Sequence, residues 1–516
     1  MKGNILKSKL AGNIYFVVVF ILLFFYYGLN ETLFYPPQSV HIWRQTNSLS
    51  LAQNYYQNNY PLLKPEMHNQ FPDDGHSGKS VGEFPIIYYV VAQLWKLFGK
   101  HEWIFKFLQV SLLFLGLFSL FHVGRRLLGN TFWAGFISLL IFTSPMVIYY
   151  GPNFLPDVPA LSFVFISWFF ISKFFDTKRL IYLWGAALFF CLSMLLKITC
   201  GTFFVALGGW VAYEIIFLDE DKRIFNFRFR HIFPFLVAII LVVAWYWYAG
   251  YYNHIHKGHF SVHGIWPIWG ASKEQLNRII DSLDQIYFKE FFLPFTQYLT
   301  LGIWIYLVIR IKKLKPVFRF FILVLAVGFL LQVLLWFQVL DAHDYYMINL
   351  LVVFVSVWGV FLYQIRQGKP LVQYIAYGLA IIFFTYNVIT CKHRAEGRYI
   401  GWMNSPYENN YKALLSIEPL FDELGVGMDD KVISIPDPSI NGTLYYMNRK
   451  GYTDFGSDFN NQEAFYNRIA QGAKYLIVND STILKNSGIK PFIVEKMGEF
   501  ENVQIYDLRG ITKPSM

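Results

Sequence analysis

The acid with the most unusual setting in this sequence is Asp157, within Tyr150–Leu161 (YGPNFLPDVPAL). It stands between two prolines, and it is the only acid between Glu102 and Asp176. In the first turn of a helix such an acid can simply cap backbone N–H groups and complement the helix dipole. Flanked by apolar runs of membrane length, however, an ionisable side chain predicts a functional site. Asp157 is therefore a candidate catalytic residue.

Glu83 is the second candidate carboxylate. It precedes Phe84-Pro85, again where a helix can begin, so capping is the alternative interpretation. Two separated carboxylates that face one cavity would suit proton abstraction from a hydroxyl group. Asp73 and Asp74 have the setting of ordinary loop acids. His68 and His76 lie near them, but the spacing matches no zinc or calcium pattern, so we expect neither a metal nor another cofactor.

Several cationic and aromatic residues could hold a phosphate or a sugar opposite these acids. Lys197, in LLKITC, is a candidate phosphate ligand, although a lysine at a span end often only snorkels to the interface. His343, Tyr345 and Tyr346 could hydrogen-bond a phosphate or sugar, while an interfacial aromatic belt explains the tyrosines equally well. Arg44, in HIWRQT, could clamp a phosphate with two parallel hydrogen bonds.

The elements that must position these residues are membrane helices. Of all residues 55% are hydrophobic, 20% are aromatic and only 15% are charged, far from the composition of a soluble domain. Apolar segments near the ~20 residues that cross a bilayer recur along three quarters of the chain. We predict a polytopic α-helical membrane protein with about eleven spans, at residues 14–33, 103–123, 132–150, 157–175, 180–196, 199–217, 232–250, 291–309, 317–337, 345–363 and 371–390.

The distribution of lysine and arginine orients these spans, because cytoplasmic loops retain both residues. If the spans alternate, all basic clusters fall on one side with the N-terminus, which is therefore predicted to be cytoplasmic. The net charge of +10 is largely this topological signal, and it argues against nucleic-acid binding. The clusters are Arg125/Arg126, Lys173/Lys178/Arg179, Lys222/Arg223/Arg228/Arg230, Arg310/Lys312/Lys313/Lys315/Arg319 and Arg366/Lys369.

The opposite, extracytoplasmic side then receives the long loop 34–102. Within it, Ser48–Tyr56 has the pattern of an amphipathic helix, and Phe84–Phe98 is apolar but too short to span. Both are expected to lie in the membrane interface. Together with the spans, this loop forms a predicted catalytic domain over residues 1–390.

Residues 391–516 change in character, with more Lys, Asp, Asn and Gly and with apolar runs of strand length. They predict a small, water-soluble, extracytoplasmic α/β domain with an accessory role. We expect strands at Val432–Ile435, Tyr475–Val478, Phe492–Val494 and Val503–Tyr506, and helices at about 408–424 and 461–472. No Gly-rich phosphate-binding fingerprint is present.

Four segments of the sequence resemble the GT-C superfamily, and more closely glycosyltransferase family 39 and aminoarabinose-transferase-like proteins, over about residues 10–390. These segments are HIWRQTNSLSLAQNYY, GEFPIIYYVVAQLWKLFG, GRRLLGN and LPDVPALSF. The resemblance implies a polyprenyl-phosphate sugar donor, inverting transfer to an acceptor hydroxyl or phosphate, and no nucleotide-sugar site. Relatives typically carry an acidic pair just after the first span, where this chain has Arg44-Gln45. Either Glu83 or Asp157 takes over the role, or the site is rearranged, or activity is lost.

The expected mechanism places a lipid-linked monosaccharide phosphate in the site, its tail in an apolar groove and its phosphate on Arg44, Lys197 and His343. Asp157 or Glu83 then orients or deprotonates the nucleophile of a glycan, lipid or protein acceptor. A transporter or flippase of lipid-linked sugars is a competing hypothesis, although no internal repeat favours it. A non-catalytic assembly protein is another. The Asn, Lys and Tyr richness and the lack of a disulfide framework fit a bacterial inner membrane.

Overall fold

The chain folds into two compact units, each assembled from three separate stretches. The computed structural model describes residues 2–262, 264–284, 288–341 and 343–513. The first unit, which we call the helical unit, comprises Met1–Phe34, Lys106–Trp245 and Gly264–Glu396. The second, the mixed unit, comprises Tyr35–Phe105, Tyr246–His263 and Gly397–Met516.

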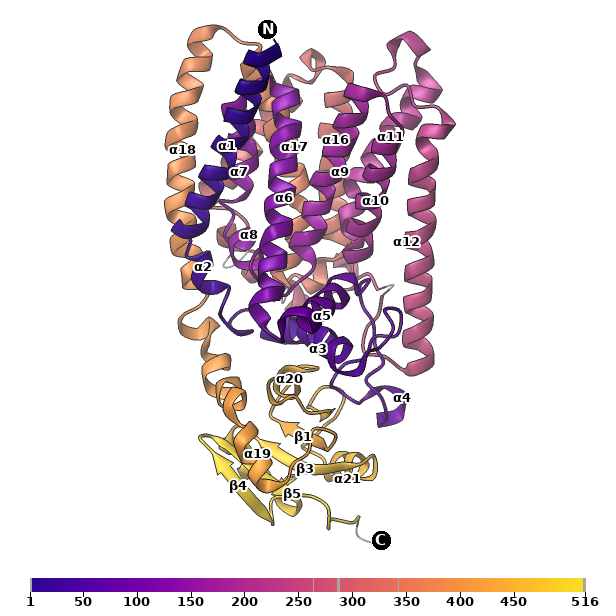
Figure 1. The fold of residues 1–516 in the computed structure, drawn as a ribbon, viewed down its shortest axis with the longest axis vertical. Coiled ribbons are helices and arrows are strands. Elements are labelled where there is room, and N and C mark those ends of the chain that lie inside the picture. The colour runs from indigo at the N-terminus through magenta and orange to yellow at the C-terminus, as the bar shows by residue number, and fades with distance from the viewer. Residues whose placement is uncertain (1, 263, 285–287, 342, 514–516) are drawn as a thin grey trace. The chain divides into compact units, whose positions relative to one another are not determined.

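The helical unit consists of long helices that run roughly parallel to one another (Figure 1). Three of them, α6, α12 and α18, have one end in the mixed unit. The helices are α1 (Lys2–Tyr26), α2 (Leu29–Thr32), α6 (Glu102–Leu128), α7 (Thr131–Ile141), α8 (Pro145–Tyr150), α9 (Asp157–Thr177), α10 (Ile181–Leu196), α11 (Thr202–Phe217), α12 (Phe229–His256), α13 (Lys273–Ser282), α14 (Phe288–Glu290), α15 (Pro294–Ile309), α16 (Pro316–Leu335), α17 (Leu351–Arg366) and α18 (Pro370–Gly397).

Among the described residues, seven helices are long and apolar enough to cross a membrane. They are Glu102–Leu128, Asp157–Thr177, Ile198–Phe217, Phe229–His256, Pro316–Leu335, Asp344–Arg366 and Pro370–Gly397. Shorter apolar helices cover four more predicted spans, at Leu10–Tyr26, Thr131–Ile141, Ile181–Leu196 and Pro294–Ile309. The prediction of a polytopic α-helical membrane protein is confirmed, whereas the number of eleven crossings stays a prediction.

One predicted span, 132–150, is interrupted. Helix α7 ends at Ile141, and α8 begins at Pro145 after a short turn. The hydroxyl of Ser144 caps α8 by accepting a hydrogen bond from the backbone N–H of Val147 at 3.4 Å. Proline lacks the N–H that a continuous helix would need, and it fits the first turn of a new helix. The break places Tyr150 at the end of a separate short helix.

Helices α9 and α10 form an antiparallel hairpin that carries candidate residues at its two free ends. Lys178 turns the chain in the left-handed conformation, with φ 56°. The hydroxyl of Ser167 donates to the carbonyl of Ala186 at 2.8 Å, and that of Ser193 to the carbonyl of Ala160 at 2.8 Å. Small hydroxyl residues let two apolar helices approach closely and bond across the contact. This packing brings the start of α9 beside the end of α10.

The mixed unit contains a five-stranded sheet in the order β2-β1-β3-β5-β4. Strand β1 is parallel to β2 and β3, while β5 is antiparallel to β3 and β4. Ile433, Leu476, Phe465 and Phe492 are fully buried in its core. The elements are α3 (Ile42–Asn58), α4 (Pro72–Gly75), α5 (Ile86–Phe98), α19 (Glu418–Leu424), β1 (Lys431–Ile435), α20 (Gly442–Met447), β2 (Gly451–Tyr452), α21 (Gln462–Ala470), β3 (Ala473–Val478), β4 (Lys496–Phe500) and β5 (Val503–Asp507).

Three of the four predicted strands and both helices of loop 34–102 are confirmed. The strand predicted at Phe492–Val494 is wrong, because Phe492 belongs to a 3-10 turn and fills the core by stacking on Phe465, with 4.3 Å between ring centroids. The fourth strand begins later, at Lys496. The helix predicted over 408–424 is divided into a π-helical turn, a 3-10 turn and α19. The functional division at residues 390/391 stays a prediction, since residues 35–105 group with residues 397–516.

Candidate active site

Asp157 is the first residue of α9, and only 3% of its side chain is exposed. Its Oδ1 atom lies 2.9 Å from the Nζ atom of Lys197, at the end of α10. Leaving one charge buried alone would be costly, and the hairpin places the opposite charge against it. The carboxylate is therefore held in a buried ion pair.

The ammonium group of Lys197 also lies over two aromatic rings. Its Nζ atom is 3.5 Å from the ring centroid of Tyr346 and 5.1 Å from that of Tyr345. A cation at these distances is attracted by the electron-rich ring faces, most strongly where water is excluded. Lys197 thus has both a carboxylate and aromatic neighbours. It can also serve as a point charge for a phosphate.

The tyrosines belong to a 3-10 segment, Asp344–Leu350, which leads into α17. His343 stacks on both, with ring centroids 5.5 Å and 5.6 Å apart. Flat aromatic faces with hydroxyl groups at their edges can bind a sugar ring. The predicted residues Asp157, Lys197, His343, Tyr345 and Tyr346 are therefore brought together, and we call them the Asp157 group.

Two residues that were not predicted from the sequence, Tyr150 and Gln332, hold this segment in place through hydrogen bonds. The hydroxyl of Tyr150, at the end of α8, donates to the carboxylate of Asp344. The amide of Gln332 in α16 donates to the carbonyl oxygen of Tyr346 at 3.1 Å and exchanges hydrogen bonds with Asn349 at 3.1 and 2.7 Å. No local pattern in the sequence links these residues, since their partners lie 14 to 194 positions away.

Arg44 and Glu83 form a second group, in the mixed unit. The Nη2 atom of Arg44, on α3, lies 2.5 Å from the Oε1 atom of Glu83, just before α5. The hydroxyl of Tyr88 also donates to Glu83, and the Nη1 atom of Arg44 is 3.5 Å from the Oγ atom of Ser48. These four residues are the Arg44 group. The i, i+4 spacing of Arg44 and Ser48 was a usable signal in the sequence, whereas Tyr88 was missed.

Burial by itself would raise the pKa of Glu83, but the Arg44 charge and the hydrogen bonds from Tyr88 and Arg44 outweigh it, so the pKa is lowered. Glu83 is therefore charged at neutral pH. A carboxylate with a lowered pKa is a weak proton acceptor. Its setting suits orientation and electrostatics better than deprotonation.

The buried face of α3 is largely polar, and it is bonded to distant parts of the mixed unit. Asn47, one turn after Arg44, accepts a hydrogen bond from the side-chain amide of Asn441 at 2.8 Å. Asn441 in turn accepts one from the backbone N–H of Asn69 at 3.0 Å. Ser50 pairs with the ring of His68 at 2.8 Å. Buried polar groups require such partners, and directional bonds fix the rotation of the helix about its axis.

The loop acids and histidines fall outside both groups. Asp73 bonds Ser77 at 2.6 Å and His256 at 2.8 Å. Burial lowers the pKa of His68 to about 3, so this ring is neutral. In the described part of the chain, no three His, Cys, Asp or Glu side chains gather closely enough to hold a metal ion.

One segment of the chain matches the profile of a known protein family. Residues 81–247, which include Glu83, Asp157 and Lys197, match the family profile "Dolichyl-phosphate-mannose-protein mannosyltransferase". No curated protein sequence matches the chain.

Solved structures with a similar fold include the following three. ArnT from Cupriavidus metallidurans in the apo state has a TM-score of 0.60 at 11% identity, covering 98% of this chain and 100% of that one. ArnT from the same organism bound to undecaprenyl phosphate has a TM-score of 0.59 at 12% identity, covering 97% and 99%. The archaeal oligosaccharyltransferase AglB from Archaeoglobus fulgidus, in complex with an inhibitory peptide and a dolichol-phosphate, has a TM-score of 0.49 at 11% identity, covering 91% and 70%. The likeness to ArnT is one of fold, and it extends over nearly the whole of both chains.

Proposed function

We propose that this chain, an integral membrane protein with the GT-C fold, transfers a monosaccharide from a polyprenyl-phosphate-linked donor to a glycan, lipid or protein acceptor. The fold shared with ArnT and the mannosyltransferase profile over residues 81–247 support this function. The observation that carries it is the buried Asp157–Lys197 pair beside Tyr345 and Tyr346, because the pair lies within the matched segment and combines a carboxylate, a cation and aromatic faces.

In the proposed reaction, Lys197 binds the phosphate of the donor. A phosphate competes with Asp157 for the ammonium group, and the carboxylate is then available to orient the acceptor and accept its proton. The acceptor oxygen attacks the anomeric carbon from the face opposite the phosphate, so one carbon–oxygen bond forms while the other breaks and the anomeric configuration inverts. The fixed positive charge of Lys197 beside the leaving phosphate stabilises the negative charge that develops in the transition state.

The Arg44 group has a separate proposed role, in binding. The guanidinium group presents five N–H donors in a planar arrangement, so it can hold a carboxylate and a phosphate together. Glu83, charged and bonded to Arg44, would fix the orientation of that side chain. In this proposal Arg44 and Glu83 act in binding, and Asp157 supplies the catalytic carboxylate.

We further propose a bacterial inner membrane location, with the N-terminus cytoplasmic and residues 391–516 extracytoplasmic. The basic clusters at one end of the predicted spans support this orientation. Accessibility of single cysteines introduced at exposed Arg179 and exposed Lys513 to an impermeant thiol reagent in intact cells tests it. Labelling at residue 179 without labelling at residue 513 would contradict the orientation.

Two measurements on the purified protein test the proposed function. In the first, undecaprenyl phosphate is titrated and thermal stabilisation is recorded, with Lys197→Met expected to weaken binding at least tenfold. In the second, undecaprenyl-phosphate mannose with a labelled sugar is incubated with the protein, and membranes that contain acceptors are then added. Release of undecaprenyl phosphate upon addition of acceptor indicates an enzyme, and Asp157→Asn should abolish it without loss of expression.

Other outcomes favour the competing hypotheses. Movement of the intact donor across vesicle membranes without release of undecaprenyl phosphate would indicate a transporter. Failure to bind undecaprenyl phosphate would favour a non-catalytic assembly protein. Full transfer activity in Asp157→Asn would remove this residue from the catalytic role.

A further inference from the structure

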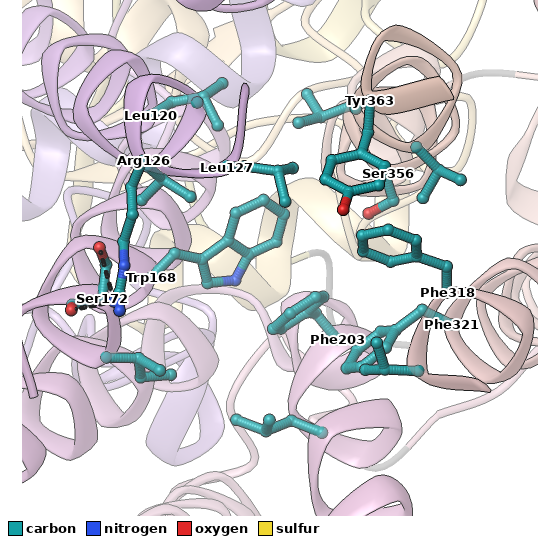
Figure 2. Close-up of a pocket in the computed structure, with 18 of the residues that line it drawn as sticks. Leu120, Arg126, Leu127, Trp168, Ser172, Phe203, Phe318, Phe321, Ser356 and Tyr363 are labelled. Atoms are coloured by element: carbon teal, nitrogen blue, oxygen red, sulfur yellow. Dashed lines mark hydrogen bonds between the residues drawn. The ribbon is translucent and has the colours of Figure 1, made fainter. Parts of the chain in front are cut away.

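The helical unit contains an apolar cavity that the proposed reaction does not use. Its volume is about 610 Å³, within the range of small-molecule sites. Figure 2 shows Leu127, Trp168, Phe203 and Phe318 around it. Helices α6, α9, α11, α16 and α17 contribute the lining.

The cavity lies toward the other end of the helices that carry the Asp157 group. Asp157 begins α9, whereas Ser172 and Phe175, which line the cavity, belong to its last turns. Fifteen residues of α-helix separate Asp157 from Ser172, or about 22 Å along the axis. Tyr363 likewise lies near the end of α17, after the segment with the tyrosines.

A buried acid holds one wall of the cavity in place. The carboxylate of Glu214 is 1% exposed and accepts hydrogen bonds from the backbone N–H groups of residues 224–226 at 2.8–3.2 Å. It also accepts one from the indole of Trp210 at 2.7 Å. These bonds fix Ile224 and Phe225 in the lining.

Trp168, which lines the cavity, carries a buried polar atom. Trp168 is 9% exposed, and its Nε1 atom finds no acceptor among the described residues. Figure 2 shows its indole on the side of the cavity where Arg126 and Ser172 lie, opposite Phe318, and its ring centroid is 4.3 Å from that of Phe203. An unsatisfied buried donor is costly, so an occupant that offers an oxygen acceptor at this position would be favoured over a pure hydrocarbon.

Two cations lie at the end of the cavity where α6 ends and α16 begins. Arg126 and Lys315 are both exposed and line it. Arg126 bonds the backbone oxygen of Ser172 and pairs with Asp176 at 3.1 Å, which leaves a net positive charge at this end. A positive charge beside an apolar cavity in a membrane helix bundle complements an anionic lipid head group.

We infer that the cavity binds one acyl chain of an anionic, ester-linked glycerophospholipid. Its phosphate lies at Arg126 and Lys315, and its ester carbonyl accepts the hydrogen bond from Trp168. Arg126, which would bind the phosphate, is bonded to Ser172, and Trp168 lies one helical turn, about 6 Å, before Ser172. This separation matches the short distance between the phosphate and the ester group of such a lipid. A polyprenyl chain offers no carbonyl, so it would leave the indole unsatisfied. This site is independent of the proposed sugar transfer.

Native mass spectrometry of the full chain in detergent tests the inference, with ester-linked and ether-linked phosphatidylglycerol as probes. The wild type is expected to bind one ester lipid about fivefold more tightly than the ether lipid, the effect of one hydrogen bond. Trp168→Phe should equalise the two affinities. Trp133→Phe is the matched control, because that indole is also buried and finds no acceptor in the described part of the chain, but it does not line this cavity. Ser356→Trp should fill the cavity and abolish binding of both lipids.

Equal affinity of the wild type for the two lipids would overturn the inference without any variant. So would the same loss of preference in Trp133→Phe, or a preference that survives in Trp168→Phe. Displacement of the ester lipid by undecaprenyl phosphate, one for one and more tightly, would assign the cavity to the donor tail instead.

Discussion

The buried ion pair between Asp157 and Lys197 makes a quantitative prediction about stability. Removing one partner of a buried pair leaves the other charge uncompensated, at a cost of about 3–5 kcal/mol. The Asp157 side chain is only 3% exposed, but that of Lys197 is 15% exposed. This partial contact of Lys197 with solvent lowers the cost of an unpaired charge, so we use the lower end of the range. We therefore expect Lys197→Met to lower the free energy of unfolding by about 3 kcal/mol.

The two single substitutions should not be equivalent. In Asp157→Asn the ammonium group of Lys197 keeps the ring of Tyr346 at 3.5 Å, an interaction worth about 0.5–2 kcal/mol. In Lys197→Met the carboxylate loses its charged partner. We therefore expect Asp157→Asn to cost about 1–2 kcal/mol less than Lys197→Met. The double variant removes both charges, so it should recover most of the loss, with a coupling energy of about 2–3 kcal/mol.

Unfolding free energies in mixed micelles, measured by steric trapping for the wild type, both single variants and the double variant, test this reasoning. If each single variant stays within about 0.5 kcal/mol of the wild type, the usual range for surface substitutions, the pair is solvated rather than buried. A double variant whose loss is the sum of the two single losses would show that the charges do not interact.

Three further predictions concern the mixed unit. The Arg44 charge and the hydrogen bonds from Tyr88 and Arg44 together outweigh burial and lower the pKa of Glu83. The stabilisation that ionised Glu83 contributes is therefore present above the unfolded-state pKa and is lost as pH falls through the folded-state value, so thermal unfolding of Glu83→Gln should depend less on acid pH than that of the wild type. Burial raises the pKa of Asp454 from 3.8 to about 6, so stability is lost as pH rises from the lower value through the higher one. Asp454→Asn should therefore raise the melting temperature at pH 7.5 and flatten its rise on acidification toward pH 5. Asn441→Ala should destabilise the mixed unit by about 1–3 kcal/mol in chemical unfolding, because it leaves Asn47 without its donor.

The predictions for Asp454 and Asn441 each have a control within the same unit. Glu495→Gln, which replaces an exposed acid of the same unit, is the control for Asp454→Asn, and an equal rise in melting temperature there would refute the reasoning about Asp454. Asn460→Ala, whose side chain is exposed, should change the unfolding free energy by less than about 0.5 kcal/mol. A loss in Asn441→Ala no larger than this would mean that the bond to Asn47 does not hold α3.

Hydropathy and turn chemistry were sufficient to predict most of the helices and strands, because both signals are local. The break between α7 and α8 was also encoded, by Ser144-Pro145, but the apolar run on both sides hid it. Phe492 was assigned to a strand since it is apolar and near Val494, yet a single buried ring can fill a core from a 3-10 turn. Hydrophobicity alone does not distinguish these two settings.

The pairing of the candidate side chains could not be predicted in the same way. Asp157 and Lys197 meet because α9 and α10 pack as a hairpin, and Arg44 meets Glu83 across 39 residues of sequence. Residue type indicated that each could matter, but only the packing shows which charge neutralises which. Ser48–Tyr56 had the pattern of an amphipathic helix, and its polar side chains nevertheless find buried partners far along the chain.

The polar face of α3 also has a consequence for biosynthesis. Asn47 and its partner Asn441 are 394 residues apart, so the helix leaves the ribosome long before the segment that satisfies it. At about 5–20 residues per second, translation of the intervening chain takes roughly 20–80 s. During that time the asparagine and serine side chains need water or a chaperone in place of their final partners. A nascent chain stalled before Asn441 would therefore expose an incomplete fold that quality-control proteases can recognise.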